Sequence, residues 1–87
     1  MGRTQERFRT PNMWLAAYLL LEGFRHLDIV MADGNQHAEF VFEGGDEIDQ
    51  AVDEFEIGTA VVEPRGYMKS VSFARKRLRN RMESARL

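Results

Sequence analysis

The sequence predicts a small α+β domain, and three patterns carry this prediction. Apolar residues recur with helical spacing in three segments, and they alternate with polar residues along two neighbouring segments. Residues that favour a tight turn separate those two segments, as in a β-hairpin. The 87 residues suffice for one domain only, because a second core would have too little chain to bury it. We therefore expect a single α+β domain with the element order α-β-β-α-α and a two-stranded antiparallel hairpin.

The first predicted helix begins after residue 10. Thr10 suits the N-cap, Pro11 the first helical position, and Gly23 the residue just past the end. Residues 13–21 are apolar on every side, and such a helix needs cover nearly all round. It is therefore either the central element, or one of its sides meets a second copy of the chain. Residues 1–9 are expected to be a flexible basic tail, with residues 10–87 as the globular domain.

We expect one side of this helix to meet a second copy of the chain, and hence a homodimer, because the chain is small and this helix is so apolar. The candidate residues for self-association are Trp14, Tyr18 and Leu21. Core packing is the alternative interpretation of Trp14 and Tyr18, which lie one helical turn apart.

Residues 24–43 are expected to form the hairpin, with Gly34 and Asn35 at the centre of its turn, where positive φ angles are needed. In that register the apolar residues of the two strands face each other and share one side of the sheet. The expected pairs are Met31 with Ala38, Ile29 with Phe40, and Leu27 with Phe42.

Two further helices follow the hairpin. Residues 46–57 form an acidic amphipathic helix with Gly58 at its end, because apolar residues recur there at intervals of three and four. Residues 59–62 are either a short third strand or a linker. The last helix begins near Pro64 and carries one apolar stripe. The stripe consists of Tyr67, Val71, Ala74, Leu78, Met82 and Ala85.

Charge is distributed unevenly along the chain, although the whole carries a net charge of only −2. Residues 1–10 sum to +2 and residues 11–40 to −3, whereas residues 41–63 sum to −8 and residues 64–87 to +7. Opposite blocks of this size favour pairing between them, within the molecule or across a dimer. We therefore expect the acidic segment to neutralise most of the basic final helix.

The stretch SFARKRLRNRM, residues 72–82, holds five basic residues and one phenylalanine. One interpretation is a solvated helix face whose cations pair with the acidic segment, each exposed pair adding about 0–1 kcal/mol. The other is a site for nucleic acid or another polyanion, in which arginines bind phosphate and an exposed ring stacks on a base. The negative net charge and the lack of a known nucleic-acid-binding motif speak against it. The candidate residues for binding a polyanion or a partner are Phe73, Arg75, Lys76, Arg77, Arg79 and Arg81.

No arrangement for catalysis is expected. The carboxylates of residues 46–56 fall on the polar side of a helix, and their spacing does not fit a calcium-binding loop. In the expected hairpin His26 faces Glu43 and His37 faces Ala32, which puts the two histidines too far apart to share an ion. Both are interpreted as exposed strand residues. We therefore expect no enzyme activity, no metal site and no cofactor.

The sequence also bears on location. The longest apolar run has nine residues, 13–21, whereas a bilayer crossing needs about twenty. The chain has no cysteine, which excludes disulfides and thiolate metal sites and fits a reducing compartment. We therefore expect a cytoplasmic protein with no membrane partner.

Several short motifs lie along the chain, at Leu15–Leu21 with Gly23, Phe40–Phe42, Glu63-Pro64-Arg65 and Arg75–Arg79. They resemble the LAAFLL-type helix, the FVF strand and the basic closing helix of a known family of small bacterial and bacteriophage proteins, a domain of unknown function. The resemblance covers about residues 10–82 and implies a phage or mobile-element setting, without an activity, a cofactor or site residues.

These observations lead to two functional hypotheses. The first is a small non-catalytic binding or regulatory module, a homodimer that acts through protein–protein contacts. With the resemblance, this becomes a phage or mobile-element accessory protein that engages a host factor. The alternative is a protein that binds nucleic acid or an anionic nucleotide through its arginine-rich final helix.

Overall fold

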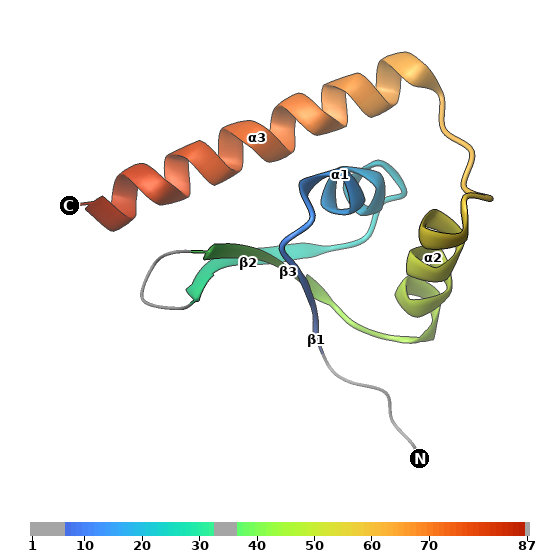
Figure 1. Ribbon diagram of the computed structural model, residues 1–87, viewed down its shortest axis with the longest axis horizontal. Helices are drawn as coiled ribbons and strands as arrows, with labels where there is room; N and C mark the ends of the chain where they lie inside the picture. Colours follow the sequence, from blue (N-terminus) through green and yellow to red (C-terminus); the bar gives the residue numbers. More distant parts are fainter. Residues whose placement is uncertain (1–6, 33–36, 87) are drawn as a thin grey trace.

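The computed structural model describes residues 7–32 and 37–86. Three strands and three helices follow in the order β1-α1-β2-β3-α2-α3, and the strands form one antiparallel sheet (Figure 1). The α+β class is confirmed, and the expected order lacks only the first strand. The predicted turn at Gly34 and Asn35 lies outside the described residues.

The sheet has β3 (His37–Glu43) at its centre, between β1 (Arg7–Thr10) and β2 (His26–Ala32). Phe40 and Phe42 of β3 are almost fully buried and belong to the hydrophobic core. The central strand thus joins the hairpin to the first strand and supplies the largest core side chains.

The hairpin register is confirmed on the side near the turn. The confirmed pairs there are Met31 with Ala38, Ile29 with Phe40 and Ala32 with His37. Further from the turn, the predicted pairs of Leu27 with Phe42 and of His26 with Glu43 are wrong. A bulge between His26 and Asp28 shifts the register, so that His26 lies opposite Phe42. A bulge adds one residue to one strand, and side-chain alternation alone did not indicate it here.

The strand β1 occupies part of the segment that the sequence assigns to a flexible tail. Arg7 lies opposite Glu43 and Phe8 opposite Phe42 in an antiparallel pairing with β3, and Phe8 packs against the core. The prediction is therefore wrong for residues 7–9. Residues 59–62 form no strand and link α2 to α3, so the third strand of the sheet is β1.

Helix α1 (Met13–Leu21) begins later than predicted. Its N-cap is Asn12, whose side-chain oxygen accepts hydrogen bonds from the backbone N–H groups of Trp14 and Leu15. Thr10 instead accepts from the backbone N–H of Asn12 and so shapes the turn before the helix.

The predicted stop of α1 at Gly23 is confirmed. Gly23 has a φ of 92°, a conformation that only glycine adopts without strain. The N–H of Gly23 donates to the carbonyl of Leu20, and the N–H of Phe24 donates to that of Leu19. This pair of bonds is a Schellman motif, which satisfies carbonyls that the helix end would leave free.

Helix α1 is the central element of the fold. Its residues from Leu15 to Leu19 are buried, and it packs against β1, α2 and α3 (Figure 1). The cover that an all-round apolar helix needs thus comes from the same chain. The sequence left two alternatives, a central helix or a helix with one side against a second copy of the chain, and the structure shows a central helix.

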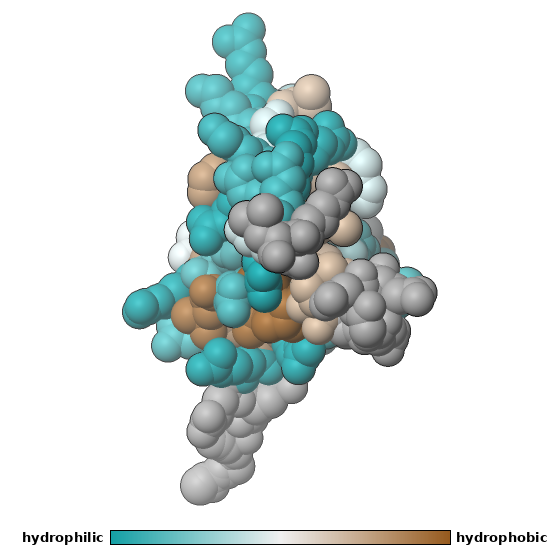
Figure 2. Space-filling view, turned by 90° about the vertical axis from the view of Figure 1, so that its left-hand side faces the viewer, coloured by the Kyte–Doolittle hydropathy of each residue, from teal (hydrophilic) through white to brown (hydrophobic). Residues whose placement is uncertain are grey.

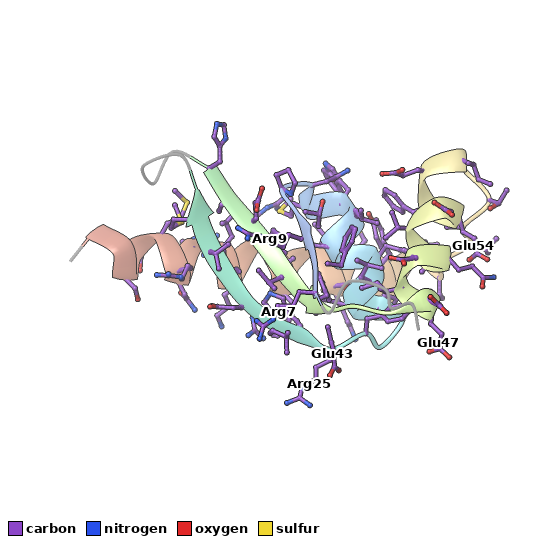
Figure 3. The ribbon with its side chains drawn as sticks, turned by 90° about the horizontal axis from the view of Figure 1, so that it is seen from below. Arg7, Arg9, Arg25, Glu43, Glu47 and Glu54 are labelled. Carbon is purple, nitrogen blue, oxygen red and sulfur yellow. The ribbon has the colours of Figure 1, made fainter. Side chains whose placement is uncertain are left out.

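Helix α2 (Asp46–Ile57) has the predicted amphipathic pattern, with Ile48 and Ala51 buried. It ends at Gly58, whose φ of 86° is left-handed, and the N–H of Thr59 donates to the carbonyl of Glu54. Its acidic side chains extend away from the core at one end of the molecule, as Glu47 and Glu54 do in Figure 3.

Helix α3 (Pro64–Arg86) crosses α1 near its own beginning. The Tyr67 hydroxyl donates to the carbonyl of Trp14 at 2.9 Å, and the Ser70 hydroxyl donates to the carbonyl of Ala17 at 2.5 Å. At about 1.5 Å per residue, a helix of 23 residues is longer than the small core that it covers. Its second half therefore extends beyond α1, over the side of the molecule that carries the hairpin (Figure 1).

Candidate anion-binding surface and cleft

Most of the basic residues of α3 lie on its projecting second half. Arg75, Lys76, Arg77 and Arg79 are all exposed. Phe73, at 48% exposure, is an exposed aromatic side chain among them, as its place opposite the apolar stripe predicts. We call these five residues the α3 cationic surface.

Phe73 and Arg77 lie one helical turn apart and contact each other. The guanidinium carbon of Arg77 is 5.2 Å from the centroid of the Phe73 ring, within the range of a cation–π interaction. Such a contact at an exposed site contributes about 0.5–1 kcal/mol. It favours one orientation of the Arg77 side chain while leaving its N–H groups available.

The prediction that the acidic segment neutralises these cations is wrong for the single chain. Within residues 7–32 and 37–86, the ion pair joins Arg9 to Glu39, at 3.0 Å on the sheet, and no carboxylate pairs with a cation of the α3 cationic surface. Helix α2 lies at the opposite end of the molecule from the projecting half of α3 (Figures 1 and 3). The hairpin and α1 occupy the space between them, which the linear charge pattern does not reveal.

A cleft of about 380 Å³ lies between β2 and the second half of α3. We call it the β2–α3 cleft. Viewed from this end, hydrophilic surface gathers around α3, above an apolar area on the strand layer (Figure 2). The floor of the cleft includes Leu27 and Ile29. Its polar lining residues are His26, Asp28, Arg77, Asn80, Arg81 and Ser84.

Arg81 joins the two walls of this cleft. Its Nε donates a hydrogen bond of 2.8 Å to the carbonyl of Ile29. The side chain is therefore partly buried, and of the six candidates on α3 it is the one that helps to hold the helix to the sheet. That bond uses one of five N–H donors, and the four others form no hydrogen bond to a described residue.

His26 is partly buried beside the cleft, so its interpretation as an exposed strand residue is wrong. The imidazole ring lies 5.2 Å from the ring of Phe42 and 5.9 Å from that of Phe40, measured between centroids. Both ring nitrogens are shielded from water and have no hydrogen-bond partner among the described residues. The bulge in β2 causes this, because it turns His26 toward the phenylalanines of the core.

The surroundings of His26 favour its neutral form. Burial lowers the pKa of the imidazole, and the positive charge of Arg77 lowers that pKa further. The backbone and carboxylate of Asp28 act in the opposite direction with smaller effect. The cleft therefore carries two arginine charges and one aspartate charge around a neutral histidine.

The predicted self-association residues do not share one surface. Tyr18 is only 3% exposed and its ring lies 5.4 Å from that of Phe55, so it is a core residue. Leu21 is partly buried, with its side chain close to Gly66 of α3. Trp14 is 52% exposed and remains available to a partner. Tyr18 is therefore wrong as a candidate.

Two further properties of the described helices and side chains bear on other kinds of site. None of these helices combines the length and the apolar character that crossing a bilayer requires. Residues 7–32 and 37–86 also contain no group of three or more histidine, aspartate or glutamate side chains arranged to hold a metal ion.

The fold and this surface define a small α+β domain in which a central apolar helix supports an exposed cationic helix. The chain belongs to the family described as a domain of unknown function, DUF5659, whose model matches residues 5–82. The predicted membership of an uncharacterised family of small domains is thus confirmed. No curated protein and no solved structure matches the chain.

Proposed function

We propose that the protein binds single-stranded nucleic acid through the α3 cationic surface. The observation that carries this proposal is the exposure of four cations on the projecting half of α3, without a carboxylate partner among the described residues. Cations that are not neutralised by their own protein can replace the counterions that surround a phosphate backbone. The release of those counterions supplies the free energy of binding.

The aromatic ring among the cations favours a single strand over a duplex. Bases of a single strand are open to stacking, and each base stacked on an aromatic side chain adds about 1–3 kcal/mol. Phe73 is half exposed and offers such a ring next to Arg77. The acidic side chains of α2 lie at the other end of the molecule, where they repel a bound strand least (Figure 3).

Fluorescence anisotropy with a labelled single-stranded oligonucleotide that carries a 5′-hydroxyl end tests this proposal. We expect binding at about 50 mM salt that weakens steeply as salt is raised. The double substitution of Arg75→Gln and Arg79→Gln removes two phosphate contacts. It should lower the affinity and reduce the slope of log affinity against log salt by about 1.4, at about 0.7 per contact for single strands.

Arg65→Gln is the matched control. Arg65 is an exposed arginine on the same helix, in its first turn and far from the α3 cationic surface. The control should leave the affinity within about twofold of the parent protein and the salt slope unchanged, since a distant exposed charge is largely screened. An absence of binding at about 50 mM salt would refute the proposal.

We also propose, as a second candidate, that the protein forms a homodimer or contacts another protein through Trp14. A tryptophan that is 52% exposed at the start of an otherwise buried helix supports this, because tryptophan is enriched where protein partners bind. Sedimentation at about 50 µM, well above a micromolar dissociation constant, tests it. We expect a dimer that dissociates in Trp14→Gln, and a strict monomer at that concentration would exclude self-association.

The setting of the protein is part of the proposal. The resemblance to small bacterial and phage proteins supports a phage or mobile-element accessory module that works in the cytoplasm, where a host factor or a nucleic-acid strand would be its partner. We propose that the protein binds either kind of partner without catalysing a reaction.

A further inference from the structure

The β2–α3 cleft differs from the α3 cationic surface in the elements and the chemistry that form it. The cationic surface belongs to α3 alone, whereas the cleft is an open hollow of about 380 Å³ between β2 and α3, and Arg77 is common to both. Arg77, Asn80, Arg81 and Ser84 share one side of α3 because their spacings of three and four residues match the helical repeat. Each of them presents N–H or O–H donors to the cleft.

The donors on the α3 side of the cleft are suited to a phosphate group. Two guanidinium groups one helical turn apart can bind phosphate oxygens with charge-assisted hydrogen bonds. Arg77 is oriented by the Phe73 ring, and Arg81 is oriented by its bond to the Ile29 carbonyl. Both side chains have therefore lost part of their conformational freedom before a ligand arrives, which lowers the entropic cost of binding.

The β2 side of the cleft has a different character. Asp28 lines it with a carboxylate, of which one oxygen accepts a hydrogen bond from the backbone N–H of Ile29 at 2.8 Å. The other oxygen can accept from a ligand, and its charge excludes a second phosphate from that side. The cleft is thus arranged for a ligand with a phosphate at one end and hydroxyl or amino donors at the other.

We propose that the β2–α3 cleft binds a nucleoside 5′-monophosphate, with the phosphate at Arg77 and Arg81 and a sugar hydroxyl or base amino group at Asp28. The same chemical group occurs as a free nucleotide and at the 5′ end of a phosphorylated strand. This inference goes beyond strand binding by the α3 cationic surface, because it requires a discrete site in the cleft. The two sites share Arg77, but the cleft does not depend on Arg75, Lys76 or Arg79.

His26 provides an internal reporter for this site. Its ring nitrogens are shielded from water, so they do not bond to the ligand in this arrangement. It lies close enough to Arg77 for that charge to lower its pKa, and a bound phosphate neutralises the charge. Ligand binding should therefore raise the pKa of His26, as measured from the NMR shifts of the imidazole protons.

Calorimetry with AMP, adenosine and inorganic phosphate tests the proposal. We expect AMP to bind, adenosine to bind at least about tenfold more weakly, and Arg77→Gln to weaken AMP binding about tenfold or more, as the loss of a charge-assisted hydrogen bond implies. Arg79→Gln is the matched control, because it makes the same charge change on the same helix at a residue that does not line the cleft. It should leave AMP affinity within about twofold, since exposed charges are largely screened. Asn80→Ala is a second site variant should Arg77→Gln perturb the fold.

Several outcomes would overturn this inference. One is that AMP does not bind at about 1 mM, which corresponds to about −4.1 kcal/mol. Another is that AMP and adenosine bind equally well, or that Arg77→Gln and Arg79→Gln lose the same AMP affinity. A pKa of His26 that does not change when AMP is added would also overturn it.

Oligonucleotides with and without a 5′-phosphate distinguish the two sources of the group. A preference for the phosphorylated strand that Arg77→Gln abolishes identifies a strand end. AMP binding with equal affinity for both strands identifies the free nucleotide. Failure of the 5′-hydroxyl strand to bind refutes only the proposed strand binding, whereas failure of AMP to bind refutes only the cleft.

Discussion

At the scale of single residues, His26 shows how one inserted residue changes the role of a side chain. Its position beside polar residues suggests a solvated strand histidine, and regular alternation would keep it opposite Glu43. The bulge moves it opposite Phe42, and its nitrogens become shielded from water. A buried polar group without a hydrogen bond costs free energy, and the neutral imidazole costs less than the charged one.

This environment predicts how the free energy of unfolding depends on pH. The folded pKa of His26 is lowered from 6.5, so between that value and the folded pKa the unfolded chain binds more protons than the folded one. The contribution of His26 to stability is therefore fully present above about pH 6.5 and is lost as the pH falls through the folded pKa. Urea unfolding between about pH 7.5 and about pH 5 should show this loss.

His26→Phe keeps an aromatic ring at this position and removes the proton-binding group. We expect the variant to lose less stability than the parent protein over the same pH interval. Arg77→Gln should raise the pKa of His26 in NMR titrations, because it removes one of the two causes of the lowered value. Identical pH slopes for the parent and His26→Phe would contradict this account.

At the scale of elements, the contact between α1 and α3 decides where the cationic helix lies. Ser70 is buried in this crossing, and its hydroxyl donates to the carbonyl of Ala17, while Tyr67 bonds to the carbonyl of Trp14. Val71 and Ala74 are buried beside them. Only the first half of α3 is anchored in this way, and that leaves the second half to project over the hairpin.

Ser70→Ala tests this anchoring. Loss of the buried hydrogen bond should lower the free energy of unfolding by about 1 kcal/mol, within the usual range of about 0.5–1.5 kcal/mol. Ser72→Ala makes the same chemical change at an exposed position of the same helix. We expect it to change the free energy of unfolding by less than about 0.5 kcal/mol in urea unfolding. Equal effects of the two substitutions would mean that the Ser70 bond does not anchor α3.

Elements with a strong periodic pattern were predictable, and short or irregular ones were not. The apolar repeat of residues 46–57 and the glycine after it fixed α2 and its end. Four residues of β1 are too few for an alternating pattern to be recognised. Its pairing depends on β3, whose paired residues lie thirty or more positions further along the chain. The six candidate residues on α3 were found from charge and periodicity, but their division between an open surface and a cleft was not.

At the scale of the whole molecule, the charge blocks lie far apart instead of pairing. The acidic helix α2 and the projecting half of α3 lie at opposite ends, with the central helix and the sheet between them (Figures 1 and 3). Charges separated by more than a Debye length, about 8–10 Å in physiological salt, interact weakly. The molecule therefore has a cationic end and an acidic end despite its small net charge, and its binding properties depend on the end that a ligand meets.

The sequence by itself determined the α+β class, the bounds of the strongly amphipathic helices, the hairpin register near the turn and the presence of a cationic helix with one aromatic residue. These features depend on interactions between residues close together in the chain, and such interactions leave a periodic pattern. Only the tertiary structure decided that β1 completes the sheet and that α1 is covered by its own chain. It also decided that a bulge buries His26 and that the α3 cations are remote from α2. Each of these depends on contacts between distant segments, and on how the small core orients long elements in space.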